Sequence, residues 1–180
     1  MKTIVYLCLL IGCFAATLTR AKSQPDWSWL LERTALPPRD LINDKQFIEL
    51  LEKYGPRLKV DLGVNPNKKK NAAMEAAVLE AMTGEADPIQ VLTPGTLVLS
   101  GCRATNCDEK GFVWIDVERR QLVMALIHFL FEGVRSTEPQ VMYSAKSVAC
   151  KKIPEPAVEA IRNWIRSKGI TPKAFRCADR

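Results

Sequence analysis

The chain has 180 residues, of which 47% are hydrophobic and 26% are charged, and its formal net charge is +6 at pH 7. This length and apolar content allow one ordinary hydrophobic core, and no internal repeat indicates a second domain. The charge is only mildly basic, so we expect no nucleic-acid partner. The run Lys68-Lys69-Lys70 is more typical of a solvated loop than of a phosphate-binding surface.

The N-terminus has the pattern of an export signal. Lys2 precedes an uncharged apolar run, Ile4–Ala16, which is too short to span a bilayer. Thr19 and Ala21 are small residues that suit cleavage after Ala21. We therefore expect a signal peptide at residues 1–21 and a single mature domain at residues 22–180, located in the periplasm or secreted.

A lipoprotein signal is the alternative for the same segment. Leu10-Ile11-Gly12-Cys13 has the form of a lipobox, so Cys13 would become a lipidated, membrane-anchored N-terminus. The hydrophobic run continues past this cysteine through Phe14-Ala15-Ala16, which favours the cleaved signal. Either signal takes the protein out of the cytosol, and membrane contact is expected only if Cys13 is lipidated.

Four cysteines remain after cleavage, namely Cys102, Cys107, Cys150 and Cys177. An even number in an exported chain indicates disulfides. Of the three possible pairings we favour Cys102 with Cys107, which closes a local loop, and Cys150 with Cys177, which fixes the C-terminal tail. Loop-closure entropy gives them roughly 2 and 3.5 kcal/mol of stabilisation.

Zinc binding and redox catalysis are the rival uses of these cysteines. The C-x4-C spacing is loose for zinc, and no C-x-x-C pair is present to complete a zinc site or to form a reactive dithiol. We therefore expect no metal.

Helical periodicity recurs on both sides of the middle of the chain. A short helix is predicted at Trp27–Leu31, before Pro37-Pro38. Asn43 is placed to cap the next helix, with Gln46 at the capping-box position and Gly55-Pro56 at its end. Later helices are predicted at Asn71–Thr83, with Gly84 as a left-handed C-terminal residue, and from Pro154 and Pro156 to Gly169.

The middle of the chain has the composition of β-strands. β-Branched and aromatic runs are separated by Pro94-Gly95, by the first cysteine pair and by the polar turn Glu118–Gln121. The predicted strands are Ile89–Leu92, Thr96–Ser100, Gly111–Val117, Leu122–Phe131 and, with a weaker pattern, Val141–Tyr143. We therefore expect an α+β fold in which helices flank an antiparallel sheet and a disulfide-closed loop joins two strands.

The residues offer little catalytic chemistry. The one histidine, His128, lies in the most apolar stretch, where a hydrogen-bonded core residue is the simpler interpretation. No nucleophile, phosphate-binding or metalloprotease motif is present. The acids Asp108, Glu109, Asp116 and Glu118 fit solvated turns. We expect no enzyme activity and no cofactor, unless carboxylates converge in three dimensions.

The loop Cys102-Arg103-Ala104-Thr105-Asn106-Cys107 is the remaining candidate site. A cross-link inside so short a loop removes conformational freedom in advance, so the loop can enter a partner's cleft at a lower ordering cost. A purely structural bridged turn is the alternative.

The stretch VLSGCRATNCDEKGFVWIDVERRQLVMAL resembles the core of the Ivy family, the bacterial inhibitors of vertebrate C-type lysozyme. The resemblance spans about 30 residues, 98–126. In that family a strand ends in a Cys-Lys-Pro-His-Asp-Cys loop, which enters the lysozyme active-site cleft so that its histidine contacts the catalytic carboxylates. A strand and a hairpin follow.

Carried over by position, Cys102 and Cys107 match the family's cysteines and Arg103 keeps the cation. Ala104 replaces the proline, Thr105 the histidine and Asn106 the aspartate. The resemblance implies that Thr105 donates a hydrogen bond to a partner carboxylate and that Arg103 pairs with one.

The resulting hypothesis is a protein-binding inhibitor that plugs the cleft of a lysozyme or another muramidase, with Arg103, Thr105 and Asn106 at the tip. The first alternative is an envelope or toxin-immunity module that uses another surface, for instance the helix around Trp164. The second is an enzyme with convergent carboxylates. A homodimer is a further possible assembly.

Overall fold

The computed structural model describes residues 25–60, 72–131, 134–146 and 148–178. The predicted signal peptide and the Lys68–Lys70 run lie outside the described residues. Among the residues that are described, no helix is long and apolar enough to cross a membrane.

Helices and a six-stranded sheet make up the fold, which is α+β as predicted. The helices are α1 (Trp29–Glu32), α2 (Pro38–Ile42), α3 (Lys45–Tyr54), α4 (Met74–Glu80) and α5 (Glu155–Ser167), with 3-10 turns η1 (Arg33–Ala35) and η2 (Cys150–Lys152). The strands are β1 (Lys59–Val60), β2 (Ala72–Ala73), β3 (Gln90–Thr93), β4 (Thr96–Arg103), β5 (Asn106–Asp116), β6 (Gln121–Phe131), β7 (Val134–Ala145) and β8 (Ala174–Cys177).

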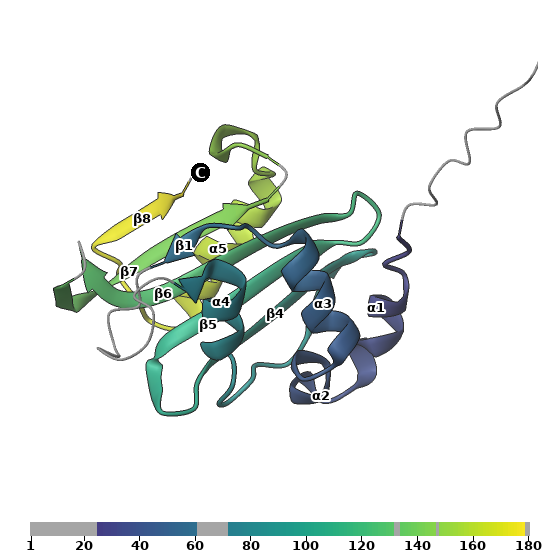
Figure 1. Cartoon of the computed structure of the whole chain (residues 1–180), viewed down its shortest axis with the longest axis horizontal. Coiled ribbons are helices and arrows are strands. Elements are labelled where there is room, and N and C mark those ends of the chain that lie inside the picture. Colours follow the sequence, from purple (N-terminus) through teal and green to yellow (C-terminus); the bar gives the residue numbers. More distant parts are fainter. Residues whose placement is uncertain (1–24, 61–71, 132–133, 147, 179–180) are drawn as a thin grey trace, which may run out of the picture.

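The large sheet has the order β3-β4-β5-β6-β7-β8 and separates two hydrophobic cores. The helices α3 and α4 lie in front of the sheet in Figure 1, and α5 lies behind it. Strand β6 contributes side chains to both cores. Leu122, Met124 and Leu126 pack with the N-terminal helices on one face. Val123, Ala125 and Ile127 pack with α5 on the other face. Burial of each of these leucine, methionine, valine and isoleucine side chains stabilises the fold by about 1.5–3 kcal/mol. The prediction of a buried central strand is confirmed.

The cap of α3 differs from the prediction by one residue. Asp44 is the N-cap, and its carboxylate accepts hydrogen bonds from the backbone N–H groups of Gln46 (2.7 Å) and Phe47 (3.2 Å). Asn43 is instead the C-terminal cap of α2, and Gln46 therefore does not occupy the capping-box position. Because α2 ends directly before α3, the aspartate is the first residue with extended backbone.

We expect Asp44→Ala to lower the free energy of unfolding by about 1 kcal/mol, because two helix N–H groups lose their acceptor. Urea denaturation at pH 7 measures the change. Asp44→Asn retains an acceptor and is expected to lose only a few tenths of a kcal/mol, while Asn43→Ala is the neighbouring control. A larger loss for Asn43→Ala than for Asp44→Ala would contradict this assignment.

Helix α4 is shorter than predicted. It begins at Met74 because Ala72 and Ala73 pair with β1 as a second, two-stranded sheet. Gly84, predicted to be left-handed, is not among the residues with positive φ; among the described glycines these are Gly95 and Gly169. Its small size is required because a Cβ at this position would collide with the backbone of Ala104.

The C-terminal part follows the prediction for α5 and departs from it afterwards. Helix α5 begins after Pro154 and buries Val158, Ile161 and Ile165, as predicted. The strand β8 was not predicted, and it pairs parallel to β7, so the sheet is mixed and mostly antiparallel. Trp164 is only 6% exposed and packs on Phe112 (ring centroids 4.9 Å apart), so its side chain belongs to the core between α5 and the sheet. The alternative binding surface on the helix around Trp164 stays a prediction.

Candidate functional site

The candidate loop is the turn of the β4–β5 hairpin. Arg103 pairs with Asn106 across the hairpin, with a register shift after Cys102, and the Cys102–Cys107 disulfide joins Cα atoms 4.7 Å apart. Ala104 and Thr105 form the exposed tip. Asn106 accepts a hydrogen bond from the Asp108 N–H (3.3 Å), which holds the second side of the turn.

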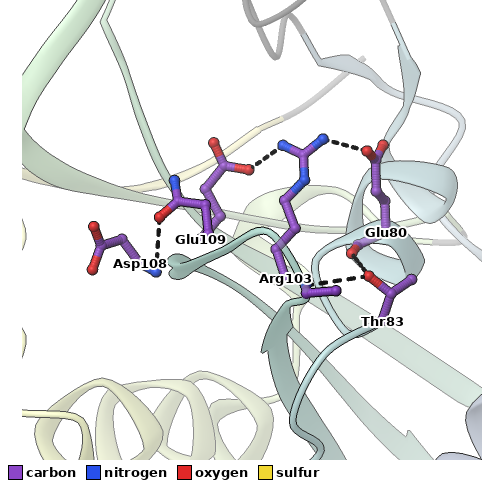
Figure 2. Close-up of polar contacts among 7 residues, drawn as sticks. Glu80, Thr83, Arg103, Asp108 and Glu109 are labelled. Carbon is purple, nitrogen blue, oxygen red and sulfur yellow. Dashed lines mark hydrogen bonds and ion pairs between the residues drawn. The ribbon is translucent and has the colours of Figure 1, made fainter.

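The connection after α4 supports one side of this loop. The Gly84 N–H donates to the Cys102 carbonyl (2.8 Å), and the Cys102 N–H donates to the Glu85 carbonyl (2.9 Å). A Cβ on Gly84 would lie 2.8 Å from the Ala104 Cα, so only glycine allows the two segments this close. The Ala104 N–H also points to the Thr83 hydroxyl (3.5 Å; Figure 2). The loop is therefore anchored by a second segment.

Arg103 forms an ionic clamp at the base of the loop. Its guanidinium donates to Glu109 of β5 (2.5 Å) and to Glu80 at the end of α4, and lies between the two carboxylates in Figure 2. The side chain is only 18% exposed. We name this group the Arg103 clamp, comprising Glu80, Arg103 and Glu109.

The clamp changes the role expected for Arg103. Burial lowers the pKa of Arg103, but the hydrogen bonds and charges of Glu109 and Glu80 outweigh burial and raise the pKa above its ordinary value. The guanidinium thus stays charged and is engaged within the chain. The resemblance implied that Arg103 pairs with a partner carboxylate, whereas in this structure its charged end turns back toward α4 and pairs with Glu80 and Glu109. Of the three expected tip residues, Thr105 is exposed and Asn106 is half-buried.

Two acids expected in solvated turns are buried. Glu109 is 8% exposed in the Arg103 clamp, and Asp116 is 4% exposed, where it accepts hydrogen bonds from the Arg119 backbone N–H (2.8 Å) and guanidinium (2.9 Å). Burial of a carboxylate requires such partners, because an unpaired buried charge is costly. Asp108 is exposed, as predicted.

His128 lies beneath the clamp in β6. With Glu80, Arg103 and Glu109 it lines a small hollow that has no room for a water molecule. The side chain is 5% exposed, and burial, with a smaller effect from the positive charge of Arg176, lowers its pKa to about 4. At neutral pH His128 is therefore an uncharged core residue, as its apolar surroundings predicted.

The positions of the cysteines and carboxylates bear on the two alternatives of zinc binding and catalysis by convergent carboxylates. All four described cysteines are in disulfides, Cys102–Cys107 and Cys150–Cys177, the pairing favoured from their spacing, so none is a thiolate ligand for zinc. Glu80 and Glu109 do converge, but the guanidinium of Arg103 separates them and no deep cleft opens there.

A sequence model of the family described as inhibitor of vertebrate lysozyme (Ivy) matches residues 69–167, just over half of the chain. The chain belongs to the Ivy family. The match extends beyond residues 98–126 in both directions: it begins before α4 and continues through the loop to the end of α5. Searches of curated proteins and of solved structures each found no significant match.

Membership in the Ivy family supports the coarse functional prediction. Its members are described as inhibitors of vertebrate lysozyme, so a lysozyme-inhibitor-like function with a protein partner follows, and a role other than catalysis fits. The matched segment contains the whole candidate loop and all three residues of the Arg103 clamp. The sequence did not indicate that Glu80 and Thr83 contact the loop. The only sign of a structured segment there was the predicted amphipathic helix that ends near them.

Proposed function

We propose that this protein inhibits a lysozyme or another muramidase by inserting the tip of the Cys102–Cys107 loop into the enzyme's cleft. The observation that carries the proposal is an exposed Ala104-Thr105 tip on a cross-linked, clamped hairpin within the Ivy-family segment. A loop that is already ordered loses little conformational entropy on binding. Steric blockage of the cleft is therefore the main effect of the tip.

Within this proposal, Thr105 provides the polar contact at the tip. Its hydroxyl can donate a hydrogen bond to a carboxylate in the cleft. The hydroxyl stays uncharged, so Thr105 itself adds no pH dependence to this contact in the range where a histidine would titrate. Ala104 is small and lets the tip approach closely.

We further propose that the mature protein, residues 22–180, is a single domain that acts in the periplasm or after secretion. The export pattern of residues 1–21 and the two disulfides support this location, because disulfides persist in oxidising compartments. Lipidation at Cys13 is the alternative form of export, and mass spectrometry of the mature N-terminus distinguishes the two.

Substitution at the tip tests the mechanism. We expect Thr105→Ala to weaken inhibition of a vertebrate lysozyme about tenfold, the value of one hydrogen bond to a charged group. Thr105→Pro or a bulky Thr105→Trp should weaken it further by changing the shape of the tip. The measurement is the inhibition constant for lysis of cell-wall substrate.

Thr93→Ala is the matched control, since Thr93 is an exposed threonine in β3, next to the β3–β4 turn rather than the loop. It should inhibit like the unmodified protein. Inhibition that is unchanged in every Thr105 variant would exclude insertion of the tip.

A further inference from the structure

Strand β3 is a free edge of the six-stranded sheet. It pairs with β4 on one side, and among the described residues no strand or backbone hydrogen bond occupies its other side. Of the three large hydrophobic residues that are exposed in the described parts of the chain, two are neighbours in this strand, Val91 (55%) and Leu92 (46%). Edge strands are commonly protected from pairing by charged residues or proline, and Gln90–Thr93 contains neither. The edge is therefore open to another strand.

A groove lies beside this edge, between the sheet and α5. Its volume is about 410 Å³, within the range of ligand-binding sites. The register with β4 shifts between Val91 and Thr93, so Leu92 is the extra residue of a β-bulge, a feature that redirects a side chain at a sheet edge. Leu92 lines the groove together with residues of the core between α5 and the sheet, namely Val98, Phe112 and Trp164. The groove thus extends this core to the surface at β3.

The charged groups of the groove are paired within the chain. Lys168 donates to Asp87 (2.6 Å), which also accepts from the Ser100 hydroxyl (2.6 Å). Glu159 accepts from the Arg166 guanidinium (2.8 Å). The groove therefore offers apolar surface and neutral polar groups, and it fits an uncharged segment, because an added charge would have no partner there.

We infer that β3 and this groove bind a partner protein by strand addition: an uncharged, extended segment of the partner pairs with β3 and places an apolar side chain in the groove. Main-chain hydrogen bonds along the edge hold the segment, and the groove selects its side chain. A helix fits the site poorly, because its backbone groups are hydrogen-bonded to one another and would leave those of β3 unpaired. The groove contains no residue of the Cys102–Cys107 loop, so this inference does not depend on the proposed function.

A model peptide tests whether the edge binds a strand. The probe is fluorescein-labelled Lys-Thr-Leu-Val-Leu-Thr-Lys, which has an uncharged apolar centre and terminal lysines for solubility, and binding is measured by fluorescence polarisation. Two N-methylated versions, each methylated at alternate residues, lose the N–H groups of one edge of the peptide or of the other. We expect one version to bind about tenfold more weakly and the other to bind nearly as the parent peptide, since a single edge of the peptide faces β3. Absence of binding at about 1 mM parent peptide, or an equal effect of both methylations, would overturn the inference.

Substitutions at exposed positions test whether the peptide occupies this groove. Leu92→Lys replaces an apolar contact by a charge, and Asn163→Trp narrows the groove from α5; each is expected to weaken peptide binding about tenfold. Leu31→Lys is the matched control, because Leu31 is the third exposed large hydrophobic residue and lies in α1, and it should change binding less than twofold. Equal binding by all three variants would overturn the assignment to the groove.

A second copy of the chain is the competing occupant of the edge. Sedimentation velocity of the unmodified protein and of Leu92→Lys measures this directly. We expect both to have the same oligomeric state. A dimer of the unmodified protein that Leu92→Lys abolishes would assign the edge to self-association and overturn the inference of a separate partner.

Discussion

The Cys102→Ser/Cys107→Ser double variant should lose inhibition by about 10- to 100-fold while losing no more than about 2 kcal/mol of stability. The disulfide closes a separation of only five residues, so it restricts the unfolded chain little. Its main effect is on the loop, where Ala104 and Thr105 have no core contacts to order them. The Arg103 clamp remains at the base, so the loop loses rigidity without unfolding.

The Cys150→Ser/Cys177→Ser variant is the matched control for this result. That disulfide spans 27 residues and joins η2 to β8, and its loss is expected to cost about 3.5 kcal/mol. Inhibition should persist wherever the variant is folded, because neither cysteine is near the tip. Urea denaturation and inhibition constants are measured for both variants. Full inhibition by the Cys102→Ser/Cys107→Ser variant would contradict the proposal that the cross-linked loop is the inhibiting element.

A second large effect is expected from acidification, through His128. The pKa of this buried side chain is lowered to about 4, whereas an unfolded histidine has a pKa of 6.5. Between these values the unfolded chain binds a proton that the folded chain does not. The free energy of unfolding therefore falls as the pH decreases from about 6.5 to 4, by about 3 kcal/mol, and then becomes independent of His128.

The comparison that isolates this effect is between the unmodified protein and His128→Gln. Urea denaturation from pH 7.5 to pH 3.5 gives the free energy of unfolding of each, and the difference removes the contribution of the carboxylates. The unmodified protein should show the steeper decline below pH 6.5. Parallel curves would mean that His128 takes up its proton with an ordinary pKa in the folded state.

A strand or helix could be predicted where its own residues show the hydrophobic pattern or the end signals of that element. Strand β6 could be identified because its apolar residues fill both faces, and α5 because Pro154 and Gly169 bound it. Strand β8 has four residues and no distinctive pattern, so it exists only through its pairing with β7. The cap at Asp44 depended on where α2 ends, which no local rule determines.

The candidate site likewise has one part that the sequence could predict and one part that it could not. The cysteine spacing was enough to predict the closed loop, since both partners lie within six residues. The clamp was not predictable, because Glu80 and Arg103 are 23 residues apart and meet only after α4 packs on the sheet. Burial of Glu109 follows from that packing, and its neighbour Asp108 stays exposed on the alternate side of the strand.

The frame of the hairpin is built from residues other than those at its tip. The disulfide, the Arg103 clamp and the close approach of Gly84 fix where the tip stands, and none of them depends on the side chains of Ala104 or Thr105. Under the proposed function, substitutions at these two positions are expected to change what the tip binds and to leave the fold intact. A randomised library at 104 and 105 would change specificity on a constant scaffold.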